Sequence, residues 1–347
     1  MEATMQNRII EKGKLLDENG NIREPGYAKE YLLEYNRNDI KAKKWRIKEW
    51  DYYYVGNDQH AICLTISDMG YLGAMSATVM DFTKPSQITK SSVFFFPMGK
   101  LHMPPTTAKG DAICVNGGVE MSFINDGKTR HIFGKYPKFG DKGEELSFDF
   151  VLSDNPEECM FIATPFDTPK YFYYNAKINC LSAKGEFRLG KKVYSLDNAL
   201  GTLDWGRGVW TYDNTWYWGS LQTILPDGKK FGFNIGYGFG NTSAASENML
   251  FYDGKSHKLE DVKFNIPGDG TDDVRYTEPW TFTSSDGRLE LDFEPVIDRY
   301  APVDLKVMCM IPHQVFGWFS GKCILDDGTV IHLDKVMGFA EKVHNKW

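Results

Sequence analysis

The sequence lacks the features that would place the chain in a membrane or on a nucleic acid. No run of eighteen apolar residues occurs, so no transmembrane helix is predicted. The N-terminal stretch has no apolar core of the kind found in signal peptides. The net charge is −7, and a mildly acidic chain offers no general attraction for nucleic acid or for an anionic membrane. We therefore expect neither of these as a partner.

Metal and cofactor motifs are also absent. None of the six cysteines forms a CxxC pair, and no His/Cys cluster has the spacing of a zinc site. Walker, HExxH and GxSxG sequences do not occur, and the glycines at 236–240 precede a polar loop instead of the helix that a dinucleotide site needs. We expect no metal and no organic cofactor, and we interpret the cysteines as reduced, mostly buried thiols of a cytoplasmic protein.

Strand-like segments and turns make up most of the chain. From residue 45 onward, short runs rich in Val, Ile, Phe, Tyr, Trp and Thr alternate with Gly, Asp-Gly and Pro turns. Long amphipathic helices are absent, so the pattern is typical of an all-β sandwich or barrel. Residues 1–44 form a leader, in which YAKEYLLEYN at 27–36 predicts a short helix.

An internal repeat predicts two domains. The segment ELSFDF at 145–150 matches RLELDF at 288–293 with an offset of 143 residues, and the same offset relates Cys180 to Cys323. A length of 347 residues also fits two domains. The prediction is a helical leader at 1–44 followed by two tandem antiparallel β-barrels, at 45–200 and 201–347.

The stretch at 202–241 is the best candidate for a ligand pocket. Four of the nine tryptophans lie in its first seventeen residues. Because residues i and i+2 of a strand share a face, one face of the segment 210–218 should carry Trp210, Tyr212, Asn214, Trp216 and Trp218. The strand at 231–239 alternates aromatic residues with glycines, which allow a backbone or a ligand to approach closely. We predict an aromatic-lined cavity in the second domain or at the domain junction, with further ligand-binding residues Trp205, Asn234 and Tyr237.

Asp204 and Arg207 are the first candidates for catalysis. A carboxylate in an aromatic site has its pKa raised by desolvation and lowered by a nearby guanidinium. Asp204 is therefore a candidate proton donor or base, with Arg207 tuning it; a structural ion pair is the alternative. Gly208-Val209-Trp210 also matches the G-x-W pattern of lipocalin barrels, in which the tryptophan closes one barrel end under an arginine.

Three further segments extend the list of candidates. Glu247 is the third catalytic candidate and Asn248 a ligand-binding one, because an acidic residue in a loop of small residues can face a cavity; a capping or turn role is the alternative. His313 is the histidine most plausibly near a pocket, although a lone histidine is more often structural. Asp298-Arg299-Tyr300 is either a pocket segment or a loop ion pair, and the basic residues at 41–48 are either an anion-binding patch or a solvated strand face.

Four stretches of the chain resemble the domain of unknown function 2804 family: FYYNAKINCLSAKGEF, LDWGRGVWTYDNTWYWGS, FGFNIGYGFGNTSAASENMLFYDGK and the closing GFAEKV. The family looks like a distant relative of the carotenoid hydratase (hydroxyneurosporene synthase) and lipocalin-like group, which implies two lipocalin-like (calycin) barrels. Some members of that group hydrate or cyclise alkenes without a cofactor. Their D-H-x-W-G type motif has a histidine, whereas this chain has Asp204-Trp205-Gly206.

Three functions fit these features. The first is a cofactor-independent lyase, hydratase or isomerase that acts on an apolar or mixed small molecule, with Asp204 as the acid and aromatic faces stabilising a cationic intermediate. The second is a non-catalytic carrier of a lipid-like ligand, which a cavity without titratable groups would favour. The third is a carbohydrate-active enzyme in which Asp204 and Glu247 act as paired carboxylates. The expected partner is a small apolar, aromatic or glycosidic molecule, and the expected state is a monomer or homodimer.

Overall fold

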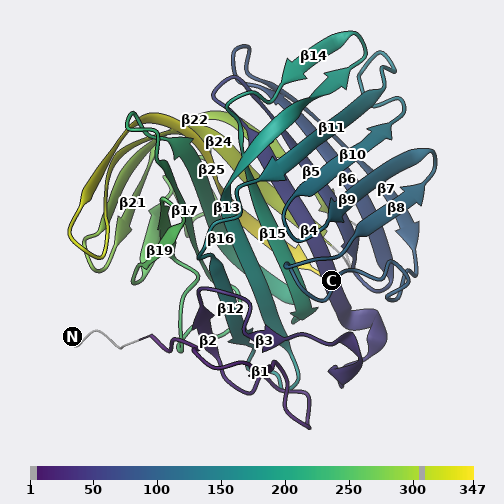
Figure 1. Cartoon of the computed structure of the whole chain (residues 1–347), viewed down its shortest axis with the longest axis vertical. Coiled ribbons are helices and arrows are strands. Elements are labelled where there is room, and N and C mark those ends of the chain that lie inside the picture. The colour runs from purple at the N-terminus through teal and green to yellow at the C-terminus, as the bar shows by residue number, and fades with distance from the viewer. Residues whose placement is uncertain (1–5, 305–308) are drawn as a thin grey trace.

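The structure, a computed structural model, describes residues 6–304 and 309–347, and its regular elements are almost all β-strands (Figure 1). The first sheet has thirteen strands. They are β2 (Gly26–Ala28), β4 (Ile47–Gly56), β5 (His60–Asp68), β6 (Leu72–Asp81), β7 (Ser86–Phe95), β8 (Ala112–Asn116), β9 (Val119–Asn125), β10 (Arg130–Tyr136), β11 (Leu146–Ser153), β12 (Met160–Pro165), β13 (Phe172–Leu189), β14 (Lys192–Ser195) and β15 (Leu200–Val209).

The second sheet has ten strands. They are β16 (Asp213–Ile224), β17 (Lys230–Tyr237), β18 (Met249–Tyr252), β19 (Lys255–Lys258), β20 (Val262–Asn265), β21 (Trp280–Ser284), β22 (Leu289–Tyr300), β23 (Val303–Asp304), β24 (Cys309–Ile324) and β25 (Val330–Lys346). No helix in the described part of the chain is long and apolar enough to cross a membrane.

The helix predicted at 27–36 is wrong. The leader instead contains β2, the short parallel pair β1 (Gly13–Lys14) and β3 (Leu33–Glu34), and two 3₁₀ turns, η1 (Arg37–Asp39) and η2 (Lys44–Arg46). β2 pairs with β12 at the edge of the first sheet, and Leu32, Leu33 and Tyr35 are buried in the core of that sheet. A ten-residue helix is marginal in water by itself, so pairing and burial against the sheet decide the conformation.

Both sheets follow the same order of pairing. In each sheet four consecutive strands pair in sequence, β4 to β7 and β16 to β19, and the last strand returns to pair with the first of the four, β15 with β4 and β25 with β16. β11 begins at Leu146 and β22 at Leu289, which differ by the 143 residues of the sequence offset. One sheet forms a nearly closed barrel and the other a half-barrel, so the predicted all-β fold is confirmed.

The two sheets pack against each other through their outer faces. In β13, Tyr174 and Ala176 point into the core of the first sheet, whereas Tyr173 belongs to a third apolar cluster between the sheets. In β16, Leu221 points into the core of the second sheet and Trp218 into the cluster between them. The chain crosses from one sheet to the other between Val209 and Asp213, so the stretch 201–209 pairs within the first sheet.

A β-bulge in β13 fixes the contact between the sheets. The register with β15 shifts between Ile178 and Leu181, and Cys180 adopts a φ of 66°. There the Cys180 amide donates to Oε1 of Gln222 (2.8 Å) in the second sheet. A Cβ atom at Gly232 would lie 2.9 Å from Sγ of Cys180, so this position of β17 requires glycine for the close approach.

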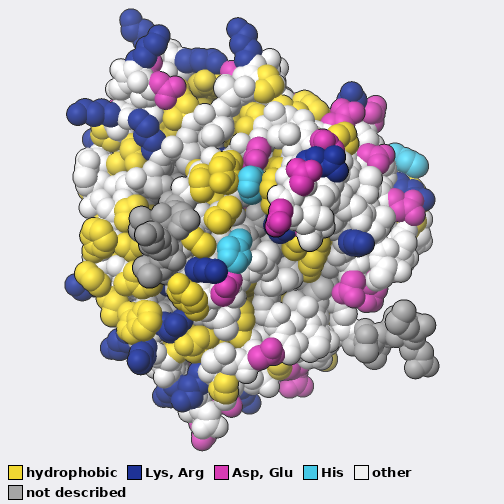
Figure 2. Space-filling view, turned by 180° about the vertical axis from the view of Figure 1, so that it is seen from behind, with side chains coloured by type: hydrophobic (Ala, Val, Ile, Leu, Met, Phe, Trp, Pro, Cys, Tyr) yellow, Lys and Arg dark blue, Asp and Glu magenta, His cyan; other side chains and the backbone are white. Residues whose placement is uncertain are grey.

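Large apolar side chains are exposed on β7 and β8 at the edge of the first sheet. Val93 and Phe95 of β7 and Ile113 and Val115 of β8 are about half exposed or more. In the rear view, hydrophobic side chains gather on the left, the side on which these strands lie (Figure 2).

Candidate functional site

A cavity of about 190 Å³ lies between the two sheets. Both sheets and the end of the chain contribute to its walls. Its lining residues are Trp50, Tyr52, Thr65, Met69, Tyr173, Lys177, Asp204, Trp210, Trp216, Trp218, Phe239, Glu247, Arg299, Met310, Gln314, Glu341, Asn345 and Trp347. An apolar cavity of roughly 150 Å³ accommodates benzene, so this one has room for a ring-sized molecule.

The first sheet contributes one cross-strand row to the cavity. Lys177 of β13 lies opposite Asp204 of β15, and Asp204 lies opposite Tyr52 of β4. Asp204 accepts hydrogen bonds from Lys177 Nζ (3.0 Å), Asn175 Nδ2 (2.6 Å) and Trp50 Nε1 (3.2 Å). These three donors hold the carboxylate in one orientation at the cavity wall.

The second sheet contributes a facing row. Arg299 of β22 lies opposite Gln314 of β24, Gln314 opposite Glu341 of β25, and Glu341 opposite Trp218 of β16. Glu341 accepts hydrogen bonds from Trp216 Nε1 (3.0 Å) and Gln314 Nε2 (2.8 Å). Burial raises the pKa of Glu341 to about 7, although the Trp216 hydrogen bond and the charges of Arg299 and Lys177 oppose this rise. Its carboxyl group can therefore hold or release a proton near neutral pH.

Lys177 links the two rows. Its Nζ atom lies 3.0 Å from Asp204, 4.0 Å from Oε2 of Glu247 and 3.7 Å from the centroid of the Trp218 ring. Asn234 Nδ2 donates to Glu247 Oε2 (3.1 Å), and Asn234 Oδ1 accepts from Trp218 Nε1 (2.7 Å). Burial raises the pKa of Glu247, and the Lys177 charge and the Asn234 hydrogen bond oppose it.

The structure brings together five of the predicted site residues and places one more behind them. Asp204, Glu247, Trp210, Trp216 and Trp218 line the cavity. Asn234 lies behind the wall, where it holds Glu247 and Trp218 in place. Whether these residues carry out a reaction stays a prediction.

Arg207 and Trp205 lie on the other face of β15. Arg207 Nη2 pairs with Asp51 (2.9 Å) and donates to the carbonyl of Pro104 (2.7 Å), and the guanidinium stacks over the Trp205 ring at 4.2 Å. Trp205 is buried in the core of the first sheet. The cation beside Asp204 is Lys177, and Arg207 is the partner of Asp51.

The remaining predicted ligand-binding residues lie outside the cavity. Asn214 closes a turn by donating to the Thr211 carbonyl (2.7 Å), and Tyr212 is exposed. Asn248 accepts from the Gly236 amide (2.7 Å). Tyr237 stacks on Tyr217, and His313 lies between Tyr276 and Tyr300 with Nδ1 2.7 Å from Asp298.

Sequence reasoning missed several residues of the cavity. Lys177 lies in FYYNAKINC, and Glu341 lies in the closing GFAEKV. Trp50 and Trp347 come from two further segments, whereas Arg299 belongs to the segment 298–300, for which the sequence left a pocket position open. Because strand pairing brings these distant residues together, no local pattern identifies them.

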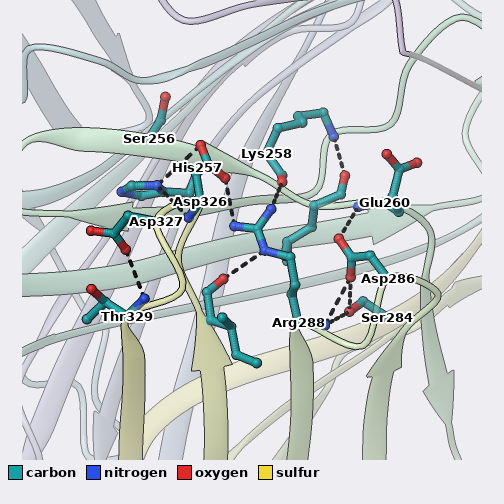
Figure 3. Close-up of polar contacts among 12 residues, drawn as sticks. Ser256, His257, Lys258, Glu260, Ser284, Asp286, Arg288, Asp326, Asp327 and Thr329 are labelled. Atoms are coloured by element: carbon teal, nitrogen blue, oxygen red, sulfur yellow. Dashed lines mark hydrogen bonds and ion pairs between the residues drawn. The ribbon is translucent and has the colours of Figure 1, made fainter. Parts of the chain in front are cut away.

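A second cluster of charged side chains, at one end of the second sheet, is bound into its own network (Figure 3). Arg288 donates to the carbonyls of Lys258 (2.8 Å) and Ile324 (2.9 Å) and pairs with Asp326 (2.7 Å). Lys258 donates to Ser246 Oγ and to two backbone carbonyls, and burial lowers its pKa to about 7. These contacts tie loops together. Among residues 6–304 and 309–347, no group of three or more His, Cys, Asp or Glu side chains is arranged to hold a metal ion.

Replacing Glu341 with glutamine is expected to change how stability depends on pH. The folded protein keeps the Glu341 proton up to about pH 7, whereas the unfolded chain releases it near pH 4.5. Stability of the wild type therefore falls as the pH rises through this window, and the glutamine variant lacks that loss. Between pH 5 and pH 8 the variant should gain about 2–3 kcal/mol in the free energy of unfolding relative to wild type.

Urea denaturation at several pH values measures this change. Glu290→Gln, at an exposed position that pairs with Lys322, serves as the matched control. If the two stability curves run parallel across this pH range, Glu341 has the same pKa in the folded and the unfolded protein, and the prediction is wrong. The constant difference between such curves would then come from the glutamine NH₂ group, which faces a hydrogen-bond donor where the carboxylate oxygen accepted a bond.

The family model of a domain of unknown function, DUF2804, matches residues 6–347. The chain belongs to this family. No curated protein matches it in sequence. Its similar solved structures include kievitone hydratase from Nectria haematococca (10% identity, TM-score 0.48, 97% of this chain and 98% of that chain). They also include CghA (12% identity, TM-score 0.41, 97% of each chain). At these identities, the function of the DUF2804 protein has to be inferred from the residues of its own site.

Proposed function

We propose that this DUF2804 protein is a cofactor-independent lyase of the hydratase type, which acts on a small unsaturated molecule in the cavity between its two sheets. The observation that carries the proposal is Glu341. It is a buried carboxyl group with a pKa of about 7 in the wall of an aromatic cavity. A general acid or base works best when its pKa is close to the working pH.

In this proposal Glu341 takes the acid role that the sequence suggested for Asp204. Its proton adds to one carbon of a carbon–carbon double bond, and the oxygen of a water molecule bonds to the other carbon while that water loses a proton to a carboxylate. The sum is addition of one water molecule, and the reverse sequence removes it. Asp204 and Glu247, each held by Lys177, are the carboxylates that lie in reach of that water.

The titratable lining supports an enzyme over a carrier. A lipid carrier gains affinity from apolar area and has no need of buried charges, which are costly to remove from water. Here three carboxyl groups and two cations line one small cavity: Asp204, Glu247, Glu341, Lys177 and Arg299. Pockets that combine apolar walls with perturbed titratable groups are typical of active sites.

Incubation with ring-sized alkenes in water labelled with oxygen-18 tests the proposal. Benzylideneacetone and cinnamate are suitable, and mass spectrometry detects the hydrated product. Glu341→Gln should lower the rate about a hundredfold, because positioned acids contribute roughly that factor, with a circular dichroism spectrum like that of the wild type. A wild type that binds these compounds in the cavity and hydrates neither would favour the carrier. An equally active Glu341→Gln variant would remove Glu341 from the reaction.

A further inference from the structure

We infer that the ligand of this cavity carries an anionic oxygen, such as a carboxylate, which the Arg299 guanidinium binds. The inference rests on the proposed function for the location of the ligand and names its chemical class. It starts from unsatisfied polar atoms. In the described part of the chain, thirteen buried side-chain nitrogen and oxygen atoms have no hydrogen-bond partner. Six of them belong to residues that line this one cavity: Trp210 Nε1, Arg299 Nε and Nη1, Gln314 Oε1, Asn345 Oδ1 and Trp347 Nε1.

Such a concentration is unusual for a purely structural region. A buried polar atom without a partner costs about 1–3 kcal/mol, more when the group is charged, so native structures keep few of them. Four of the six atoms are N–H donors: two on Arg299, one on Trp210 and one on Trp347. A ligand in the cavity would lie beside these side chains. A ligand group with several oxygen atoms would supply the hydrogen-bond acceptors that the four donors lack.

Arg299, whose Nε and Nη1 atoms are buried, differs from the buried cations Lys177 and Arg207. Lys177 has Asp204 at 3.0 Å, and Arg207 has Asp51 at 2.9 Å. Within the described residues, by contrast, Arg299 forms no ion pair with a carboxylate within 4 Å, and the adjacent carboxylate of Asp298 lies 2.7 Å from His313 Nδ1. Removing a charge from water without a counter-ion is strongly unfavourable, and the ligand is the remaining source of that counter-ion.

The groups around Arg299 do not neutralise it. Cys63, Tyr52 and Glu341 are the ionisable groups whose charge acts on Arg299. Glu341 keeps its proton up to about pH 7 because burial raises its pKa. Burial raises the pKa of the Tyr52 hydroxyl well above its ordinary value, and it also raises the pKa of the Cys63 thiol. Tyr52 and Cys63 are therefore neutral at pH 7. The guanidinium fork matches the two oxygens of a carboxylate.

Two more basic side chains adjoin the cavity from the stretch at 41–48. Arg46 Nη1 donates to the carbonyl of Trp210 (3.4 Å), and Lys48 Nζ donates to the carbonyl of Met69 (2.8 Å). Lys48 also lies 5.8 Å from the centroid of the Trp347 ring. Trp210, Met69 and Trp347 all line the cavity. Burial lowers the pKa of Lys48 to about 7, so Arg46 carries the more complete positive charge at this side, which favours the approach of an anion.

Paired probes that differ only in charge test the inference. Cinnamate and cinnamamide have nearly the same shape, and isothermal titration calorimetry measures their binding to the full-length protein. Wild type should bind cinnamate at least tenfold more tightly than cinnamamide, Arg299→Gln should remove this preference, and Arg299→Lys should keep part of it. Arg275→Gln, at an exposed arginine that pairs with Glu278, should retain the wild-type preference.

Several outcomes would overturn the inference. These are equal binding of the two probes by wild type, no binding of cinnamate, or a preference that survives in Arg299→Gln. If Arg299→Gln does not fold, the wild type and Arg299→Lys still decide the matter, because equal affinities in both would exclude recognition of charge. Hydration is scored separately. Tight binding of cinnamate without turnover of any alkene would count against the proposed function but support the anion site. Hydration of neutral alkenes without a preference for cinnamate would support the proposed function but count against the anion site.

Discussion

Replacement of Arg207 with methionine is expected to lower the free energy of unfolding by about 3–5 kcal/mol. The Arg207 side chain is fully buried, and its Nη atoms bind Asp51 and the carbonyls of Trp50, Gly206 and Pro104. Methionine fills part of the volume but leaves these acceptors without donors. Burial already raises the pKa of Asp51, and Arg207 opposes that rise. The loss should therefore be smaller at pH 5 than at pH 8, because a protonated Asp51 needs no counter-ion.

Thermal or urea denaturation measures the effect, and Arg188→Met provides the control. Arg188 pairs with Glu186 at the surface, and exposed pairs contribute about 1 kcal/mol or less. The pH profile of turnover should be unchanged in Arg207→Met, because the side chain points away from the cavity. If Arg207→Met had normal stability and a shifted pH profile of turnover, Arg207 would tune the pKa of Asp204, as the sequence suggested.

The architecture could be predicted because it depends on signals that repeat along the chain. Alternating apolar residues and turn residues identified the strands, and the offset of 143 residues placed the starts of β11 and β22. The error at 27–36 has a physical cause. The residues of that segment have helix-forming character, but the open edge of β12 and the core of the first sheet stabilise extended backbone.

The same alternation rule that located the aromatic wall also separates Asp204 from Arg207. Residues three apart in a strand point to opposite faces, so these two side chains cannot share a site within β15. Trp216 and Trp218, two apart in β16, do share the cavity face. The alternation rule alone therefore predicts that Arg207 points away from Asp204. The suggestion that Arg207 tunes Asp204 did not apply this rule.

The rest of the site depends on register, which the sequence does not reveal. Lys177 lies opposite Asp204 only because β13 and β15 pair as they do, and the bulge after Ile178 ends that register. Glu341 reaches the cavity because β25 pairs with β16, which places it opposite Trp218, more than a hundred residues away in the sequence. The cavity also lies between two sheets, so its lining could not be derived from the strands of either sheet alone.

Replacement of Lys177 with methionine is expected to be at least as damaging as the loss of Arg207, with a cost of about 3–5 kcal/mol in the free energy of unfolding. Lys177 is the cation shared by Asp204 and Glu247, and its side chain is 3% exposed. Without it, two carboxylates remain in a wall that also contains Glu341. Because Lys177 opposes the rise in the pKa of Glu247 and of Glu341, its removal should raise both pKa values further. The deficit should therefore shrink as the pH falls from 8 to 5.

The pair of the exposed Lys192 and the partly buried Asp81 offers a matched control for this prediction. Its N–O distance is 2.8 Å, close to the 3.0 Å of the Lys177–Asp204 pair, but the Lys192 side chain is 59% exposed. Lys192→Met should lower the free energy of unfolding by about 1 kcal/mol or less, so the comparison isolates burial. Adding Asp204→Asn to Lys177→Met should restore part of the lost stability, since it removes one unpaired carboxylate. Two results would contradict the view that Lys177 neutralises the carboxylates of the cavity wall. One is an equal loss of stability in Lys177→Met and Lys192→Met, and the other is no recovery of stability in the Lys177→Met, Asp204→Asn double variant.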